Sequence, residues 1–303
     1  MVTTHLGTKC GMFAMMVLLS AASCIHARAD FVSDIVLSID VWAGSSHATY
    51  VVPFSGANYD ATQRVVTWAR TTSTPLIDPN TSMTVATMRN ASLSIRHYPP
   101  RILIAGQITA GAQNAVVLIR SGWLQYPPIF AGDGGGRVSV SLGVADLNNN
   151  GAAVDAIGEE GAGIYLAESN EFVPAGVEFT ELINAIEVGA GGTATVFQND
   201  PPQGTRQLDY DVWGASVELE YTLTAMDRAS YNTQFNIEGP TFPTGDLNCD
   251  GVVNNFDIDP FTLALTDEAG FHATYPTCEI MNADINGDNA IDNFDIDAFL
   301  ELL

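Results

Sequence analysis

Basic residues are scarce in this chain and absent from its C-terminal part. From Asp246 to Leu303 there are 13 Asp and Glu residues and no Lys or Arg. The remainder holds 22 acidic and 11 basic residues, which leaves −11 there out of a formal total of −24. Such a surface repels phosphate backbones and anionic lipids and attracts cations. Nucleic acids and membrane surfaces are therefore poor candidate partners.

Long apolar runs are also missing, so no membrane span is expected. The apolar stretch from Met12 to Leu19 is shorter than the roughly 20 residues that a transmembrane helix needs. It follows Lys9 and precedes Ala27-Arg28-Ala29, a pattern typical of a secretory signal peptide. We expect residues 1–29 to be removed and the mature protein to be secreted, extracellular or at the cell surface. Cleavage before Cys24, which would give a lipoprotein, is the alternative.

Cysteine is rare once the predicted signal peptide is removed. Cys10 and Cys24 belong to that segment, which leaves Cys249 and Cys278. In an oxidising compartment such a pair forms a disulfide most simply. The alternative is two buried thiols.

The sequence signatures of common hydrolases are absent. There is no GxSxG or HExxH motif, and we interpret the three histidines of the mature chain, His47, His97 and His272, as surface or packed residues. A glycoside hydrolase needs two carboxylates about 5–10 Å apart, which spacing along the chain does not establish. The carboxylates available for such a pair are Glu159, Glu160, Glu168, Glu171, Glu178 and Glu181.

The residues between the signal peptide and a Pro- and Gly-rich boundary predict a β-sandwich or jelly roll, residues 30–239. Apolar and polar residues alternate at 37–41, 138–142 and 217–223, as in strands with one buried face. The runs 102–105 and 116–119 indicate more central strands. Turn clusters separate these segments, and only Phe179 to Val188 indicates a short helix. Residues 240–245 are the expected linker to a second domain, 246–303.

Aromatic residues beside these strands suggest a sugar-stacking face as one interpretation, and core packing as the more usual one. They are Trp42, Trp68, Trp123, Trp213, Tyr126 and Tyr210.

Beyond the boundary the sequence repeats itself. Residues 246–261 read DLNCDGVVNNFDIDPF and residues 284–299 read DINGDNAIDNFDIDAF, with nine of 16 aligned positions identical. Calcium prefers oxygen ligands, and a 12-residue loop supplies them from positions 1, 3, 5, 7, 9 and 12. The ligands are then Asp246, Asn248, Asp250, the carbonyl of Val252, Asn254 and Asp257 in the first loop, and Asp284, Asn286, Asp288, the carbonyl of Ala290, Asp292 and Asp295 in the second.

Both loops depart from an ordinary EF-hand at position 12, and the second loop also departs at position 6. Position 6 requires a sharp turn and holds Gly251 in the first loop but Asn289 in the second; Asn best replaces glycine at positive φ. Position 12 holds Asp rather than Glu. Apolar residues then recur in both copies and predict one amphipathic helix after each loop; they are Phe256, Ile258 and Phe261, and Phe294, Ile296 and Phe299.

A duplicated loop followed by one helix, with Asp at position 12, resembles the type I dockerin family over about 58 residues. This resemblance implies a helical module that folds around two calcium ions and binds a cohesin domain on a scaffold protein. The alternative is a pair of acidic turns that bind nothing.

The family's partner-binding positions correspond here to Asn255-Phe256 and Asn293-Phe294, where well-known cellulosomal dockerins have a small hydroxyl pair. Basic residues, common on the family's recognition helix, are absent. Pro260 enters the first helix early and is expected to bend or delay it.

Asp146 to Gly151 copies the first half of a calcium loop, but its twelfth position is Ile157. Asp155 and Glu159 are the residues that would complete a different cage. A polar loop between two strands is the favoured alternative.

The favoured function is non-catalytic, calcium-dependent attachment of the β-domain to a scaffold or cell surface. The alternatives are a polysaccharide hydrolase carried by its dockerin, a polysaccharide-binding protein, and a structural protein in which calcium only stabilises the fold.

Overall fold

The computed structural model describes residues 32–303 except residues 62, 159–161, 172–175 and 241. The predicted signal peptide, residues 1–29, lies outside the described residues. Within them, no helix has both the length and the hydropathy that crossing a membrane requires.

The β-domain consists of two packed sheets, each with nine strands in the described part of the chain. The first sheet contains β1 (Ile35–Ala43), β2 (Ser46–Pro53), β8 (Ala115–Ser121), β9 (Leu124–Ile129), β11 (Ala152–Ala156), β12 (Tyr165–Ser169), β13 (Val177–Leu182), β14 (Ala185–Val188) and β17 (Val212–Leu223). The second contains β3 (Asn58–Asp60), β4 (Val65–Arg70), β5 (Thr74–Ile77), β6 (Thr84–Arg96), β7 (Arg101–Ala110), β10 (Gly135–Ala145), β15 (Thr193–Asp200), β16 (Arg206–Gln207) and β18 (Arg228–Glu238).

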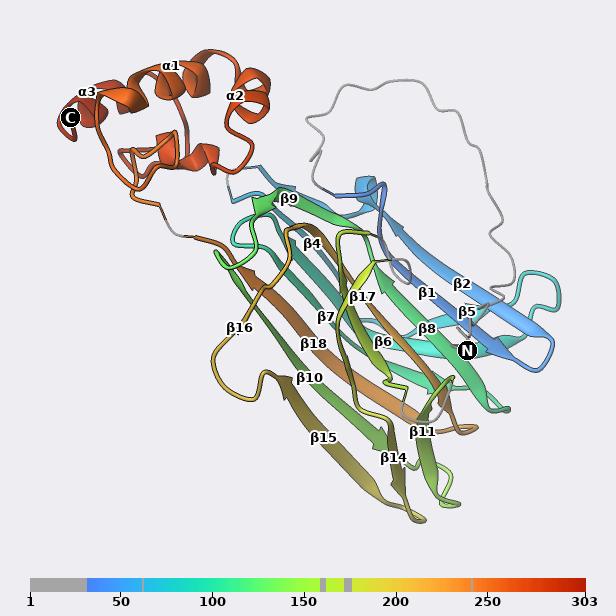
Figure 1. The fold of residues 1–303 in the computed structure, drawn as a ribbon. Coiled ribbons are helices and arrows are strands. Elements are labelled where there is room, and N and C mark those ends of the chain that lie inside the picture. The colour runs from blue at the N-terminus through green and yellow to red at the C-terminus, as the bar shows by residue number, and fades with distance from the viewer. Residues whose placement is uncertain (1–31, 62, 159–161, 172–175, 241) are drawn as a thin grey trace, which may run out of the picture.

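Neighbouring strands run antiparallel in both sheets. The order is β13-β12-β17-β8-β1-β2 in the first sheet and β15-β10-β18-β7-β6-β4-β3 in the second, with the remaining strands paired beside these paths. The prediction of a mainly β, antiparallel sandwich is therefore confirmed (Figure 1).

The core lies between the sheets and follows the alternation in the sequence. On β7, Ile102, Ile104 and Ile108 are buried, and on β17 Leu219 and Tyr221 are fully buried. Successive side chains of a strand point to opposite faces, so every second residue reaches the core. The runs expected to be central lie on β7 and β8, each inside its sheet.

The C-terminal helices lie at one end of the sandwich (Figure 1) and have a separate small core. Phe261 of the first repeat stacks on Phe299 of the second, with ring centroids 4.2 Å apart. Leu247 and Phe271 are fully buried beside them. The helical elements are η2 (Asn255–Asp257), α1 (Ile258–Thr266), α2 (Glu268–Thr274), η3 (Ile280–Ala283) and α3 (Asp295–Leu300), and η1 (Phe54–Gly56) lies in the β-domain.

A helix follows each loop, as predicted, and α2 and η3 were not expected. α1 begins after the 3-10 turn η2, and Pro260 is its third residue. The first turn of a helix tolerates proline because its N–H groups have no intrahelical acceptor.

The predicted helix from Phe179 to Val188 is wrong. Its residues form parts of β13 and β14, which pair with β12 and β11 respectively. Between the two strands Ile183 has φ of 61°, which ends the first strand and redirects the chain.

Candidate metal-binding module

The two loops have the same hydrogen bonds at position 1. In the first loop (residues 246–257), Asp246 Oδ2 accepts the N–H of Gly251 at 2.8 Å. In the second (residues 284–295), Asp284 Oδ2 accepts the N–H of Asn289, also at 2.8 Å. Each of these carboxylates thus draws the sixth residue of its loop back over the first.

Position 12 closes both loops in the same way. Asp257 Oδ1 accepts the N–H of Leu247 at 2.8 Å, and Asp295 Oδ1 accepts the N–H of Ile285 at 2.8 Å. Both aspartates are fully buried. The other carboxylate oxygens accept backbone N–H groups from Asn254 and Asp292, each at 2.9 Å.

The backbone of the loops also agrees. Positions 4 and 6 lie in the left-handed region in both, with φ of 58° at Cys249 and 93° at Gly251, and 75° at Gly287 and 66° at Asn289. The expectation that Asn289 replaces glycine at positive φ is therefore confirmed.

The donor set of each loop suits a hard cation, because it consists of carboxylate, amide and carbonyl oxygens. Among the described residues, no group of three or more His, Cys, Asp or Glu lies where it would hold a metal ion by itself. A cation in these loops would therefore need the Asn side chains and the carbonyls of Val252 and Ala290 as further ligands. Burial raises the pKa of Asp246, and the charge of Asp257 raises it further, so that a cation between these carboxylates would relieve both effects.

Cys249 and Cys278 form the predicted disulfide, with Cα atoms 5.7 Å apart. Cys249 is position 4 of the first loop, whose side chain is not a predicted ligand. The bridge attaches this loop to the segment that leads into the second.

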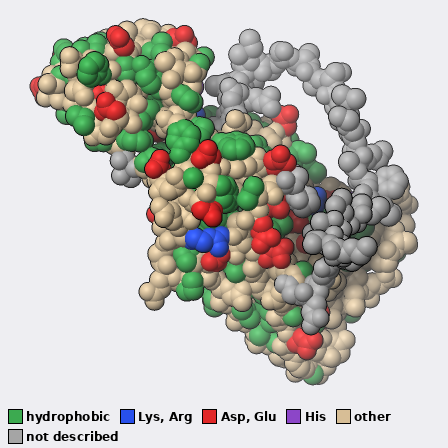
Figure 2. Space-filling model, viewed as in Figure 1, with side chains coloured by type: hydrophobic (Ala, Val, Ile, Leu, Met, Phe, Trp, Pro, Cys, Tyr) green, Lys and Arg blue, Asp and Glu red, His purple; other side chains and the backbone are tan. Residues whose placement is uncertain are grey.

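The predicted partner-binding residues are exposed in matching places. Phe256 is 73% exposed and Phe294 is 72% exposed, each at position 11 of its loop. Asn255 and Asn293 precede them and are exposed as well. On the face shown in Figure 2, hydrophobic side chains are prominent over the module, with acidic side chains among them.

The incomplete loop at Asp146 folds like the start of the other two. Asn149 and Gly151, at positions 4 and 6, have φ of 67° and 94°, and Asp146 Oδ2 accepts the N–H of Gly151 at 2.9 Å. The N–H of Leu147 donates to Asp227 Oδ1 at 3.1 Å, the place that Asp257 and Asp295 take elsewhere. The sequence did not indicate Asp227, because it lies far along the chain, in the β17–β18 turn.

Asp146 also holds together separate turns of the β-domain. Its Oδ2 accepts the N–H of Gly191 at 2.6 Å, from the β14–β15 turn. Desolvation raises the pKa of Asp146, but the backbone N–H groups of Gly151, Gly191, Asn148 and Asn149 outweigh it and lower the pKa to about 2. These bonds explain the loop without a ligand. Asp155 lies on β11, and Glu159 is outside the described residues.

The histidines occupy different surroundings. His47 Nε2 is 3.1 Å from Asp40 Oδ1, and its ring stacks on Trp42. His272 lies on α2. His97 is 3% exposed and lies 3.6 Å from Glu279 of the C-terminal module, a contact that the sequence did not predict.

Of the glutamates weighed as a catalytic pair, those that the structure describes lie on β12, on β13 and in the segment between these strands. Glu168 on β12 is buried, and burial raises its pKa, with the nearby charge of Glu218 adding to this. Glu218, which the sequence did not single out, pairs with Arg120. Glu178 and Glu181 on β13 and Glu171 before it are exposed, whereas Glu159 and Glu160 lie outside the described residues.

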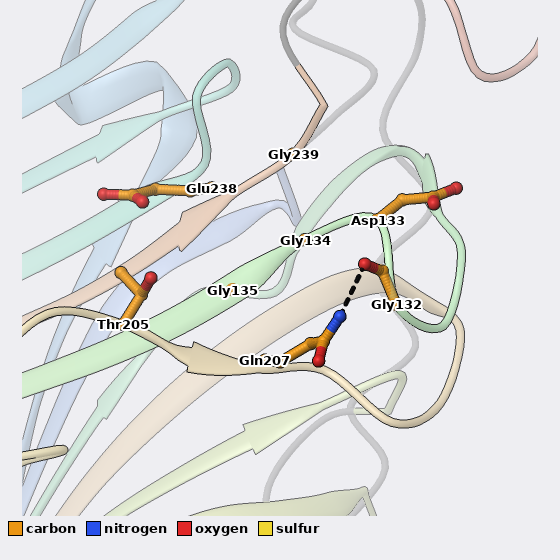
Figure 3. Close-up of a pocket in the computed structure, with 8 residues that line it drawn as sticks. All are labelled: Gly132, Asp133, Gly134, Gly135, Thr205, Gln207, Glu238 and Gly239. Atoms are coloured by element: carbon orange, nitrogen blue, oxygen red, sulfur yellow. Dashed lines mark hydrogen bonds between the residues drawn. The ribbon is translucent and has the colours of Figure 1, made fainter.

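Two concavities border β16. One, of about 330 Å³, is lined by glycines and by Thr205 and Gln207; Gln207 Nε2 donates to the carbonyl of Gly132 at 2.8 Å (Figure 3). Asp133 and Glu238 point away from Gln207 in this view. The other, of about 490 Å³, is lined by Glu178, Phe179, Arg206, Gln207, Leu208, Asp209 and Tyr210.

The aromatic residues are held by different neighbours. Trp68 packs against Tyr50, and Trp123 packs over Gly214, where an added Cβ would lie 2.0 Å from the indole ring. Tyr126 is buried, whereas Trp213 is partly exposed and Tyr210 borders the larger concavity.

No family model matches the chain, and no curated protein matches it either. Among solved structures, it is similar to the CBM22-1 xylan-binding domain of Paenibacillus barcinonensis Xyn10C, with 10% identity over 57% of this chain and 85% of that one and a TM-score of 0.22. It is also similar to the CBM22-1–GH10 modules of Clostridium thermocellum xylanase 10B complexed with xylohexaose, with 12% identity over 72% of this chain and 31% of that one and a TM-score of 0.23. At identities and TM-scores this low, the ligands of these proteins say nothing about this chain.

Proposed function

We propose that residues 246–303 form a dockerin-like module that binds two calcium ions and attaches the β-sandwich, without catalysis, to a cohesin-like domain outside the cell. The observation that carries the proposal is the agreement of the two loops. They share position-1 and position-12 hydrogen bonds and left-handed backbone at positions 4 and 6, although their sequences differ at both of these last positions.

Calcium would be held by the six predicted oxygen donors of each loop. The ion would supply positive charge to loops rich in carboxylates: the first contains Asp246, Asp250 and Asp257, and the second contains Asp284, Asp288, Asp292 and Asp295. Such a small module has little apolar core, so metal binding and the disulfide would provide much of its stability.

The calcium sites can be tested by isothermal titration calorimetry of residues 30–303. We expect two ions for the unchanged chain and one ion each for Asp257→Asn and Asp295→Asn. Asp259→Asn and Asp297→Asn are matched controls, because these exposed aspartates lie two residues further along and are not predicted ligands. Unchanged stoichiometry in Asp257→Asn and Asp295→Asn would contradict the ligand assignment.

The partner surface is proposed at Phe256 and Phe294 with the neighbouring Asn255 and Asn293. Two large apolar side chains exposed at equivalent positions are typical of a surface that a partner covers. In binding assays against a panel of cohesin domains, we expect calcium-dependent binding that Phe256→Ala combined with Phe294→Ala abolishes. Binding that persists in the double variant would place the partner surface elsewhere. Binding that persists after calcium is removed would contradict the proposed calcium dependence.

A second candidate function is polysaccharide binding by the β-sandwich. It is favoured by the larger concavity beside β16, which combines the Tyr210 ring with hydrogen-bonding groups of Gln207 and Asp209. Affinity electrophoresis in gels containing neutral polysaccharides should show retardation that Tyr210→Ala removes and Tyr50→Ala, a tyrosine outside the concavity, keeps. Equal mobility with and without polysaccharide would argue against this function.

A further inference from the structure

One carboxylate of the C-terminal module reaches into the β-domain. Glu279 Oε1 lies 3.2 Å from Arg64 Nη1, and Glu279 Oε2 lies 3.6 Å from His97 Nδ1. Glu279 is only 8% exposed and His97 only 3%. A carboxylate buried this far is stable only with a close cationic partner, and breaking such a pair is costly.

The β-domain side of this contact is a patch formed by Arg64 and His97 at adjacent strand ends. Arg64 immediately precedes β4 and His97 immediately follows β6, and the N–H of His97 donates to the carbonyl of Arg64 at 3.1 Å. Burial lowers the pKa of His97, so Arg64 provides the lasting positive charge. Next to the patch, the hydroxyl of Tyr98 donates to the carbonyl of Pro240 at 2.9 Å and fixes the chain where it leaves the sandwich.

On the module side, Glu279 is connected to both loops. Cys278, directly before it, is disulfide-bonded to Cys249 of the first loop. Asn282 Nδ2 in the following η3 donates to the carbonyl of Asp246, position 1 of the first loop, at 3.2 Å. η3 ends at Ala283, next to Asp284, position 1 of the second loop. Glu279 thus lies in a segment that is bonded to the first loop and leads directly into the second.

We propose that calcium controls the docking of the module onto the β-sandwich through Glu279. With both loops loaded, residues 278–284 are held so that Glu279 pairs with Arg64 and His97; when the ions are removed, this segment relaxes and the module separates from the sandwich. The inference rests on the calcium binding proposed above. It adds a second consequence of calcium, a change in how the two domains are joined, to the attachment of an external partner.

The test uses residues 30–303 with saturating calcium and with EGTA. Hydrogen exchange of the peptides around Arg64 and His97 reports the patch, and small-angle X-ray scattering reports the overall size. We expect calcium to slow exchange in both peptides and to reduce the radius of gyration. Glu279→Gln should lose both effects while calorimetry still counts two ions, because Glu279 is not a predicted ligand.

Arg64→Gln is the reciprocal variant, which leaves the module unchanged and should lose the same two effects. Glu301→Gln, an exposed acid of the module outside the contact, is the matched control and should keep them. If two ions bind but exchange and size are the same in calcium and EGTA, the docking inference is wrong while the calcium sites stand. If no calcium binds, both proposals fail.

Discussion

At the scale of single residues, the two loops reach one conformation from different side chains. Position 6 is left-handed in both, yet it is glycine in one and Asn289 in the other. Asn tolerates this region better than other non-glycine residues, whose Cβ crowds the backbone there. A substitution at position 6 of the second loop, Asn289, is therefore expected to change the stability of the loop conformation.

Replacing Asn289 tests this directly. We expect Asn289→Ala to destabilise the second loop by about 1 kcal/mol, because alanine pays the cost of the left-handed backbone without an amide to offset it. Asn289→Gly should bind calcium at least as well as the unchanged chain. Calorimetry gives the calcium affinity of the second site in each variant. Equal affinities for Asn289→Ala and Asn289→Gly would show that the left-handed backbone at position 6 does not affect calcium binding.

Asp146 gives a prediction about acid. Its pKa of about 2 lies below the ordinary 3.8, so the folded state holds its proton less tightly than the unfolded state. The stability it contributes is present above pH of about 4 and is lost as the pH falls toward about 2. Urea unfolding of residues 30–303, followed by tryptophan fluorescence between these pH values, should show this loss.

In that experiment Asp146→Asn should be less stable at pH of about 5, and its stability should fall less steeply with acid. Asp133→Asn changes an exposed aspartate of the same domain and is the control. Parallel loss of stability in the unchanged chain and Asp146→Asn would mean that the hydrogen bonds to Asp146 do not respond to its charge.

At the scale of elements, the sequence predicted what depends on local periodicity. The strands at 37–41, 138–142 and 217–223 lie within β1, β10 and β17, because alternation directly selects a buried face. The helix predicted at 179–188 is wrong. The apolar residues at 179, 182, 183 and 186 have a helical spacing, but the two halves of the segment belong to different strands, which pair with β12 and β11.

The disulfide is the other element-scale feature that the sequence predicted, since only two of the four cysteines lie outside the predicted signal peptide. It closes a loop across 29 residues. In the chain-entropy description such a bridge contributes about 3–4 kcal/mol by restricting the unfolded chain. We expect Cys249→Ser with Cys278→Ser to lower the thermal midpoint of the module, measured by circular dichroism of its helices in calcium.

That loss should be larger in EGTA, where no metal compensates for the missing bridge. The β-domain transition should stay unchanged, because neither cysteine contacts the core of the sandwich. If the module of the double variant unfolds at the same temperature as that of the unchanged chain, the disulfide does not stabilise the module.

At the scale of the whole molecule, the sequence did not predict the contacts between residues that are far apart in the chain. Glu279 and Arg64 are separated by 215 residues, and nothing in their local patterns marks either as a partner of the other. Asp227 near Asp146 is a similar case. Such pairs follow from the topology of the sandwich. The calcium ligands, in contrast, can be proposed from the sequence alone, because all six candidate donors of each loop lie within 12 consecutive residues.

Calcium binding by the duplicated loops can be measured by native mass spectrometry of residues 30–303, which counts the bound ions. We expect a species with two calcium ions that chelator converts to the metal-free chain, and a species with one ion for Asp257→Asn. A chain that stays metal-free in excess calcium would show that the repeat is a pair of acidic turns that bind no metal.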